Sequence, residues 1–110
     1  MQVFIGYWTP TEKWSALSAA ARTAYLSKVS AATRLKLGSE AESVAWGKNE
    51  DPRSQNQWKF FCVWKFPRAE MCEQYLAILD SQGWNDYFQT ESMYAAPKTP
   101  FDVLTQHVTL

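Results

Sequence analysis

Hydrophobic and polar positions alternate along this chain with two periods, and each period predicts a different kind of element. A period of two, in segments rich in β-branched and aromatic residues, predicts strands over 2–8, 42–49 and 58–66 and a last strand from the turn at 83–88 to about residue 94. A period near 3.6 predicts a long helix over 19–37 and a second helix over 68–82. The predicted order is therefore strand, helix, strand, strand, helix, strand.

Local sequence signals predict where the helices begin and end. Thr9-Pro10-Thr11-Glu12 has the form of a capping box with proline in the first turn, so a short helical turn is expected there, and Ser18 is expected to cap the long helix. Gly38 and Gly83 are expected to end the two long helices. Thr99-Pro100-Phe101-Asp102 repeats the first signal and predicts a short C-terminal helix through about residue 107.

This order of elements predicts an α+β protein of the ferredoxin-like type. Right-handed crossovers in a strand, helix, strand, strand, helix, strand chain give a four-stranded antiparallel sheet with both long helices on one face. At 110 residues, the chain is expected to form a single domain over 1–110.

The strand predicted over 58–66 carries large apolar side chains on both faces. Trp58, Phe60, Cys62, Trp64 and Phe66 alternate with Lys59, Phe61, Val63 and Lys65. Two helices cover only one face of the sheet, and leaving several of Trp8, Trp46, Trp58 and Trp64 in water would forfeit ~1.5–3 kcal/mol for each. A second copy of the chain is the simplest cover, so the sequence predicts a homodimer in which two sheets form a barrel-like assembly.

Composition narrows the classes of function. Eleven basic and eleven acidic residues give a formal net charge of zero, which argues against a partner nucleic acid or an anionic membrane surface. The longest apolar stretch near the start, 3–8, is too short for a membrane span or a secretory signal, so a cytoplasmic location is expected. Cys62 and Cys72 lack metal-ligand spacing and are expected to be buried free thiols.

Three groups of residues suggest a family resemblance. Tyr7-Trp8-Thr9-Pro10, Trp14 with Leu17-Ser18, and Gly83-Trp84-Asn85-Asp86-Tyr87-Phe88, in this order of elements, resemble a family of small uncharacterised bacterial proteins in the dimeric α/β-barrel superfamily. That superfamily includes cofactor-independent monooxygenases of aromatic polyketides, YciI-like proteins, stress-response barrel proteins and haem enzymes related to chlorite dismutase. The resemblance implies the fold and the dimer more strongly than any reaction.

The residues give little support to metal, haem or nucleotide chemistry. His107 is the single histidine and is expected on a surface or at a helix end, and the helix over 68–82 contains no histidine that could be the axial ligand expected in the haem enzymes. The four glycines are scattered, which excludes phosphate-binding loops, but Gly6 and Gly47 lie inside strands, where another group could approach closely. No cofactor and no metal site are expected.

The candidate site residues come from the predicted strands. Resemblance to the cofactor-independent oxygenases implies a flat phenolic substrate whose anion is stabilised by Asn, Trp, Tyr or Arg donors. Tyr7, Trp46 and Trp64 are the candidate substrate-binding residues, and Asn49 and Glu91 are the candidate catalytic residues, with Glu91 as a base if it points inward. A stacked core or a dimer interface would use the same aromatic residues, and Glu91 would otherwise be an outward-facing carboxylate on an edge strand.

A binding function is the alternative to catalysis. RNA-recognition modules share this order of elements, and the segment 59–66 has a faint likeness to their third-strand motif. The segment lacks the glycines of that motif, and the zero net charge argues against RNA. The sequence therefore predicts an aromatic-lined pocket for a small organic molecule, with an oxygenase-like enzyme and a non-catalytic binding or interaction protein both open.

Overall fold

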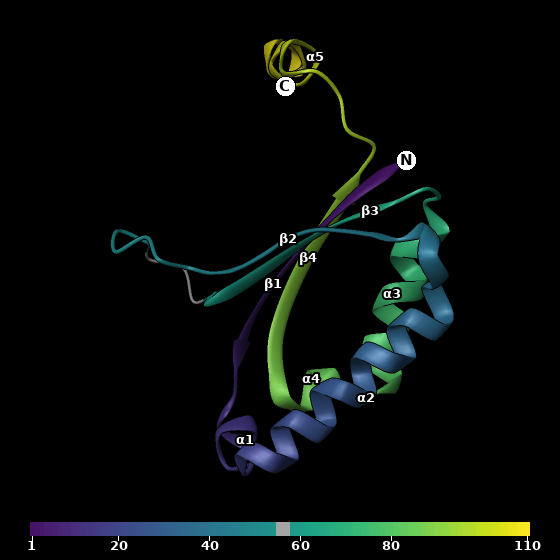
Figure 1. Ribbon diagram of the computed structural model, residues 1–110. Coiled ribbons are helices and arrows are strands. Elements are labelled where there is room, and N and C mark those ends of the chain that lie inside the picture. Colours follow the sequence, from purple (N-terminus) through teal and green to yellow (C-terminus); the bar gives the residue numbers. More distant parts are fainter. Residues whose placement is uncertain (55–57) are drawn as a thin grey trace.

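The computed structural model describes residues 1–54 and 58–110. Its elements, in chain order, are β1 (Gln2–Pro10), α1 (Glu12–Ser15), α2 (Ala19–Leu37), η1 (Gly38–Glu40), β2 (Glu42–Lys48), β3 (Phe60–Phe66), α3 (Glu70–Ser81), α4 (Trp84–Tyr87), β4 (Phe88–Ala95), α5 (Pro100–Gln106) and η2 (His107–Thr109). The strands pair antiparallel in the order β2-β3-β1-β4, with α2 and α3 along one face of the sheet (Figure 1). The predicted α+β, ferredoxin-like fold is confirmed.

Most predicted helix boundaries are confirmed by the hydrogen bonds that cap them. Ser18 Oγ accepts from the Ala21 N–H over 3.1 Å, and Thr99 Oγ1 accepts from the Asp102 N–H over 3.1 Å. Gly38 and Gly83 have φ angles of 69° and 75°, so both adopt the conformation that only glycine takes without strain. Local chemistry therefore sets the start of α2 and α5 and the turns after α2 and α3.

The predicted cap at Thr9 and Pro10 is wrong. Both residues continue β1, where Thr9 pairs with Gln89 and Pro10 with Phe88, and α1 begins only after Thr11. Thr11 Oγ1 donates to the Tyr87 carbonyl over 2.8 Å instead of capping the helix. Strand pairing with β4 has overridden the local signal. Strand β3 also begins two residues later than predicted, at Phe60. The polar segment 50–56, whose composition favours a solvated connection between strands β2 and β3, lies partly outside the described residues.

The core lies between the sheet and α3. Phe4, Phe66, Met71, Cys62 and Cys72 are the large side chains with least exposure, and both cysteines are free thiols, as predicted. The Phe4 and Tyr75 rings pack edge to face with their centroids 5.3 Å apart. This core anchors the β1 and β3 strands to α3.

The face of the sheet turned away from the helices is apolar but carries neither Trp8 nor Trp64. Trp8 and Trp64 share the helix-covered face with Phe4 and Cys62, since residues two apart on a strand lie on one face. The open face carries the alternate residues: Val3, Ile5 and Tyr7 from β1, Phe61 and Val63 from β3, and Met93 from β4. The predicted second cover for this face stays a prediction, but Trp8, Trp46 and Trp64 lie on the other face and were wrongly assigned to it.

A β-bulge decides which face Trp46 joins. In the pairing of β2 with β3, Ser43 lies opposite Trp64 and Ala45 lies opposite Val63, so Val44 has no partner. This extra residue places Trp46 opposite Cys62, on the helix-covered face. If Val44 were instead paired with Val63 in a regular strand, Trp46 would lie opposite Phe61 on the open face.

The C-terminal arm, defined as residues 96–110, extends away from the sheet (Figure 1). Every residue of the arm is exposed, including Phe101 (76%) and Leu104 (64%). A helix that carries such side chains normally buries them against another element. The arm therefore presents an unpartnered apolar surface.

Candidate functional site

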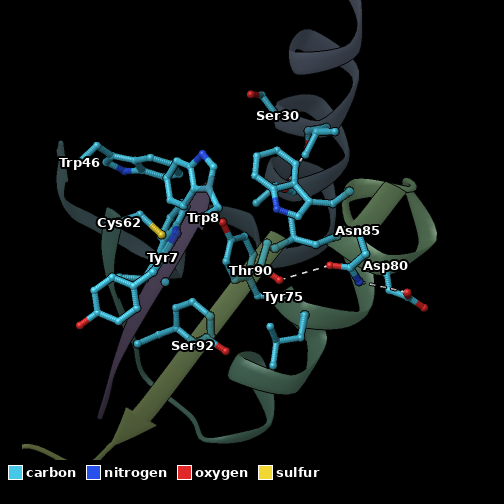
Figure 2. A pocket seen from close by; sticks show the side chains of 18 of the residues that line it. Tyr7, Trp8, Ser30, Trp46, Cys62, Tyr75, Asp80, Asn85, Thr90 and Ser92 are labelled. Carbon is cyan, nitrogen blue, oxygen red and sulfur yellow. Dashed lines mark hydrogen bonds between the residues drawn. The ribbon is translucent and has the colours of Figure 1, made fainter. Parts of the chain in front are cut away.

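A cavity of about 500 Å³ lies between the helix-covered face of the sheet and helices α2 and α3 (Figure 2). Its walls come from all four strands, from α2 and α3, and from α4, so the whole fold contributes to it. A volume of this size accommodates a small organic molecule. Side chains thus leave a pocket between the sheet and the two long helices.

Four indole rings line the pocket. Trp8 contacts Trp46, with ring centroids 5.7 Å apart, and also contacts Trp84 at 5.9 Å. The ring centroid of Trp64 lies 5.9 Å from that of Trp46 on the neighbouring strand. The side of α2 that faces the sheet supplies Leu26 and Val29. These contacts are between flat rings, so the pocket is suited to a flat apolar molecule.

The inner end of the pocket contains a small polar cluster of Cys62, Trp64 and Tyr75. The Trp64 Nε1 atom is buried and has no hydrogen-bond partner of good geometry. Burial raises the pKa of the Cys62 thiol to about 11, and it raises the pKa of the Tyr75 hydroxyl well above its ordinary value. The Trp64 indole lies close enough to lower both pKa values in part. At neutral pH the cluster is therefore uncharged and offers N–H, O–H and S–H groups.

The mouth of the pocket is polar and exposed. Thr90 Oγ1 donates to Asn85 Oδ1 over 3.3 Å, and Asn85 Nδ2 lies 3.5 Å from Asp80 Oδ1 (Figure 2). Arg34 of α2 also lines the pocket and is exposed. Charged side chains are thus found at the mouth, whereas the inner end is neutral.

The structure brings two of the five predicted site residues together in this pocket with their rings inward, Trp46 and Trp64. Tyr7 and Glu91 also contribute to the lining and pair with each other across β1 and β4. Because side chains alternate along a strand, those of Tyr7 and Glu91 point to the open face, whereas their neighbours along each strand point into the pocket. In Figure 2, the Tyr7 ring points away from α2 and α3.

Asn49 lies elsewhere, just beyond β2. Its N–H donates to the Lys59 carbonyl over 2.7 Å, and its Oδ1 accepts from the Asp51 N–H over 3.0 Å. These bonds close the end of the β2 and β3 pair. Asn49 also lines a second hollow of about 450 Å³ together with Tyr7 and Phe61. Among the five predicted residues, Asn49 alone contributes nothing to the larger pocket.

Sequence reasoning missed several residues that line the pocket. Cys62 was predicted as a buried thiol, but nothing in the pattern indicated that it meets Trp64 and Tyr75. The mouth residues Asp80, Asn85 and Thr90 come from three neighbouring elements in the last part of the chain. One signal was available, because Cys62 and Trp64 lie two apart on one strand face.

Other candidate chemistries find little support in the described part of the chain. No group of three or more potential metal-ligating residues comes together there, and no described helix has the length and apolar content of a membrane span. His107 lies in the C-terminal arm, where its Nδ1 is 3.0 Å from the Val103 carbonyl. No histidine lines the pocket, and its thiol and phenol stay protonated at neutral pH, so these residues do not fit a haem.

Solved structures with a similar fold have low sequence identity to this chain. A protein of Arabidopsis thaliana, At3g17210, has a TM-score of 0.63 at 12% identity, with 90% of this chain and 97% of that chain covered. TA0507, a candidate chlorite dismutase, has a TM-score of 0.66 at 12% identity; 86% of this chain matches 42% of that one. A DABB-family protein with a ferredoxin-like fold from Mesorhizobium loti has a TM-score of 0.53 at 8% identity, over 89% and 97% of the two chains.

These likenesses establish the fold alone, because sequence identity is low throughout. No curated protein sequence matches this chain significantly. A family model does match, over residues 1–110, and its description is a family of unknown function, DUF6616. Since the match spans the whole chain, the protein belongs to the DUF6616 family.

Proposed function

We propose that this protein binds a small, flat, largely apolar organic molecule in the pocket between the sheet and helices α2 and α3. The observation that carries the proposal is the cavity of about 500 Å³ walled by indole rings. The pocket opens to solvent at its polar mouth and has apolar walls, and a concave apolar space of this size with a few polar groups is typical of a small-molecule site. Walls formed by aromatic side chains favour an aromatic ligand.

Binding is better supported than catalysis. A cofactor-independent oxygenase would need a base to remove a proton from its phenolic substrate. The inner-end groups Cys62 and Tyr75 remain protonated at neutral pH because burial raises both pKa values. The carboxylates that line the pocket are Asp80 at the mouth and Glu91, whose side chain is directed to the open face. A reaction would therefore have to occur at the mouth, with Asp80 as the nearest candidate base.

Fluorescence titration tests the proposed binding. A neutral naphthalene derivative is expected to quench or shift the emission of Trp8, Trp46, Trp64 and Trp84 with saturation at one molecule per chain. Replacing Val29, which is buried against the pocket, by Trp should fill the space and abolish binding, whereas Leu35→Trp on the exposed side of α2 serves as the matched control. Equal titration curves for both variants, or no saturable binding, would contradict the proposal. Oxygen uptake with a naphthol in the same experiment would favour the enzyme.

The partner best supported for the open face is a second copy of this chain. Val3, Ile5, Phe61 and Val63 form an apolar surface there, and the arm, residues 96–110, presents another. Two copies related by a twofold axis would cover both surfaces, and this arrangement resembles a closed barrel. A large uncovered apolar area is a mark of an interaction surface.

Light scattering coupled to size exclusion tests the dimer. The expected mass is twice the chain mass of 12.7 kDa, and Ile5→Lys should reduce it to that of one chain. Leu35→Lys, at a side chain that is already 90% exposed, should leave the dimer intact. A monomeric protein that retains single-stranded RNA at low salt would favour the RNA-recognition alternative instead, through Tyr7 and Phe61 on the open face.

A further inference from the structure

The buried indole N–H of Trp64 identifies what the inner end of the pocket recognises. An indole nitrogen is a donor only, and buried donors in proteins nearly always have an acceptor. The Trp64 Nε1 atom has none of good geometry, although its ring is packed between Trp46, Phe66 and Tyr75. The missing acceptor is therefore expected to come from a bound molecule.

The groups around Trp64 restrict the chemistry of that acceptor. The Tyr75 hydroxyl and the Cys62 thiol lie close to the Trp64 indole, and both residues are buried and line the pocket. Each can donate a hydrogen and neither carries a charge at neutral pH. The charged residues that line the pocket, Arg34, Asp80 and Glu91, are all exposed. A carboxylate at the inner end would be a buried charge without a cation, which is strongly unfavourable.

We propose that the inner end binds the uncharged carbonyl oxygen of a flat aromatic ketone or quinone, which accepts hydrogen bonds from Trp64 Nε1 and the Tyr75 hydroxyl. Such an acceptor satisfies the buried indole while its ring system lies among the indole rings of the walls. This inference rests on the proposed function and specifies the class of ligand.

A matched set of three probes tests the ligand class by calorimetry. The probes are 2-acetylnaphthalene, the hydrocarbon 2-isopropenylnaphthalene, in which CH₂ replaces the carbonyl oxygen, and 2-naphthoate. The ketone is expected to bind at least about tenfold more tightly than the hydrocarbon, because each of its two hydrogen bonds contributes severalfold, and naphthoate is expected to bind most weakly. Tighter binding of naphthoate, or equal binding of ketone and hydrocarbon, would overturn the proposal. If none of the three binds, the proposed function itself fails.

Variants separate the hydrogen bond from general packing. Trp64→Phe and Tyr75→Phe should each weaken ketone binding severalfold and leave hydrocarbon binding nearly unchanged. Trp84→Phe, a wall residue near the mouth, should weaken both probes alike. The carbonyl infrared band of ¹³C-labelled 2-acetylnaphthalene bound to the unaltered protein gives a measurement that needs no variant. The band should move to lower wavenumber than in hexane, and an unshifted band would contradict the inference.

Discussion

Trp46 Nε1 donates a hydrogen bond to Ser43 Oγ over 2.6 Å, and this bond spans the β-bulge at Val44. Both side chains lie on the helix-covered face although they are three residues apart, a spacing that a regular strand would place on opposite faces. The bulge absorbs the extra residue and keeps Trp46 beside the pocket. Within residues 1–54 and 58–110, it is the one irregularity in the pairing of the four strands.

Deleting Val44 is expected to be tolerated. The pairs on either side, Ser43 with Trp64 and Ala45 with Val63, become consecutive without a change of register, so Trp46 stays on the pocket side. The free energy of unfolding should fall by less than about 1 kcal/mol in urea denaturation, since only a half-exposed side chain is lost. Deleting Val63 provides the comparison, because it has partners on both sides and its loss reverses the faces of the following residues. If both deletions unfold the protein, the bulge has a role beyond accommodating Val44.

Gly47→Ala should destabilise the protein because the added methyl group collides with the Phe61 ring. A Cβ atom on Gly47 would lie 2.6 Å from Phe61 Cε1, so the Phe61 ring would have to leave its place over the neighbouring strand. Such overpacking typically costs about 1–3 kcal/mol of unfolding free energy. Combining Gly47→Ala with Phe61→Leu should recover part of the loss, and a double-mutant cycle in urea measures this coupling. Strictly additive losses would show that the ring is not the cause.

Alkaline pH should destabilise the fold in a predictable window. The unfolded Cys62 thiol has its ordinary pKa near 9, whereas burial raises the folded value to about 11. Between these values the folded state holds a proton that the unfolded state has lost, so stability falls by about 1.4 kcal/mol for each pH unit and then levels off. Below the unfolded pKa this contribution is fully present.

Urea denaturation across that pH range, with Cys62→Ala for comparison, measures the effect. The variant should show a shallower fall between the two pKa values. Tyr25, whose pKa burial raises to about 12, and Tyr75 contribute in the same direction at higher pH in both proteins. Identical slopes for the two proteins would contradict the assigned cause.

Removing the C-terminal arm should weaken self-association without unfolding the sheet. Residues 96–110 are exposed throughout, and their apolar side chains are expected to pack against the second copy. A chain that ends at Ala95 should dissociate at concentrations where the full chain is a dimer, as sedimentation or light scattering would show, and should keep its thermal transition in far-UV circular dichroism. Lys98→Ala is a suitable control within the arm. Unchanged association after truncation would contradict a role for the arm at the dimer interface.

The fold was predictable from sequence where local chemistry and long-range pairing agree. Ser18, Gly38 and the Thr99 cap act within one turn, so their effects are visible in the sequence. Thr9 and Pro10 show the opposite case, because the same Thr-Pro signal yields to pairing with β4. A capping signal next to a strand is thus less reliable than one that follows a loop.

The candidate site was predictable only in part because strand faces depend on pairing partners. Trp46 and Trp64 lie on predicted strands and line the pocket, but the bulge that directs Trp46 inward leaves no signal in the sequence. Tyr7 and Glu91 are each next to an inward-facing residue on the same strand, and the sequence alone does not show which of two successive strand residues points inward. The cluster of Cys62, Trp64 and Tyr75 joins a strand to a helix, and such contacts arise only from the tertiary packing.

The pocket of about 500 Å³ occupies space that most small proteins fill with their own side chains. Any molecule that enters it adds to the stability of the native state, by about 2.7 kcal/mol when its free concentration is 100 times its dissociation constant. In a cell, the unfolded fraction exposed to proteases would fall as that molecule accumulates. The amount of this protein would then follow the supply of its ligand, with no change in gene expression.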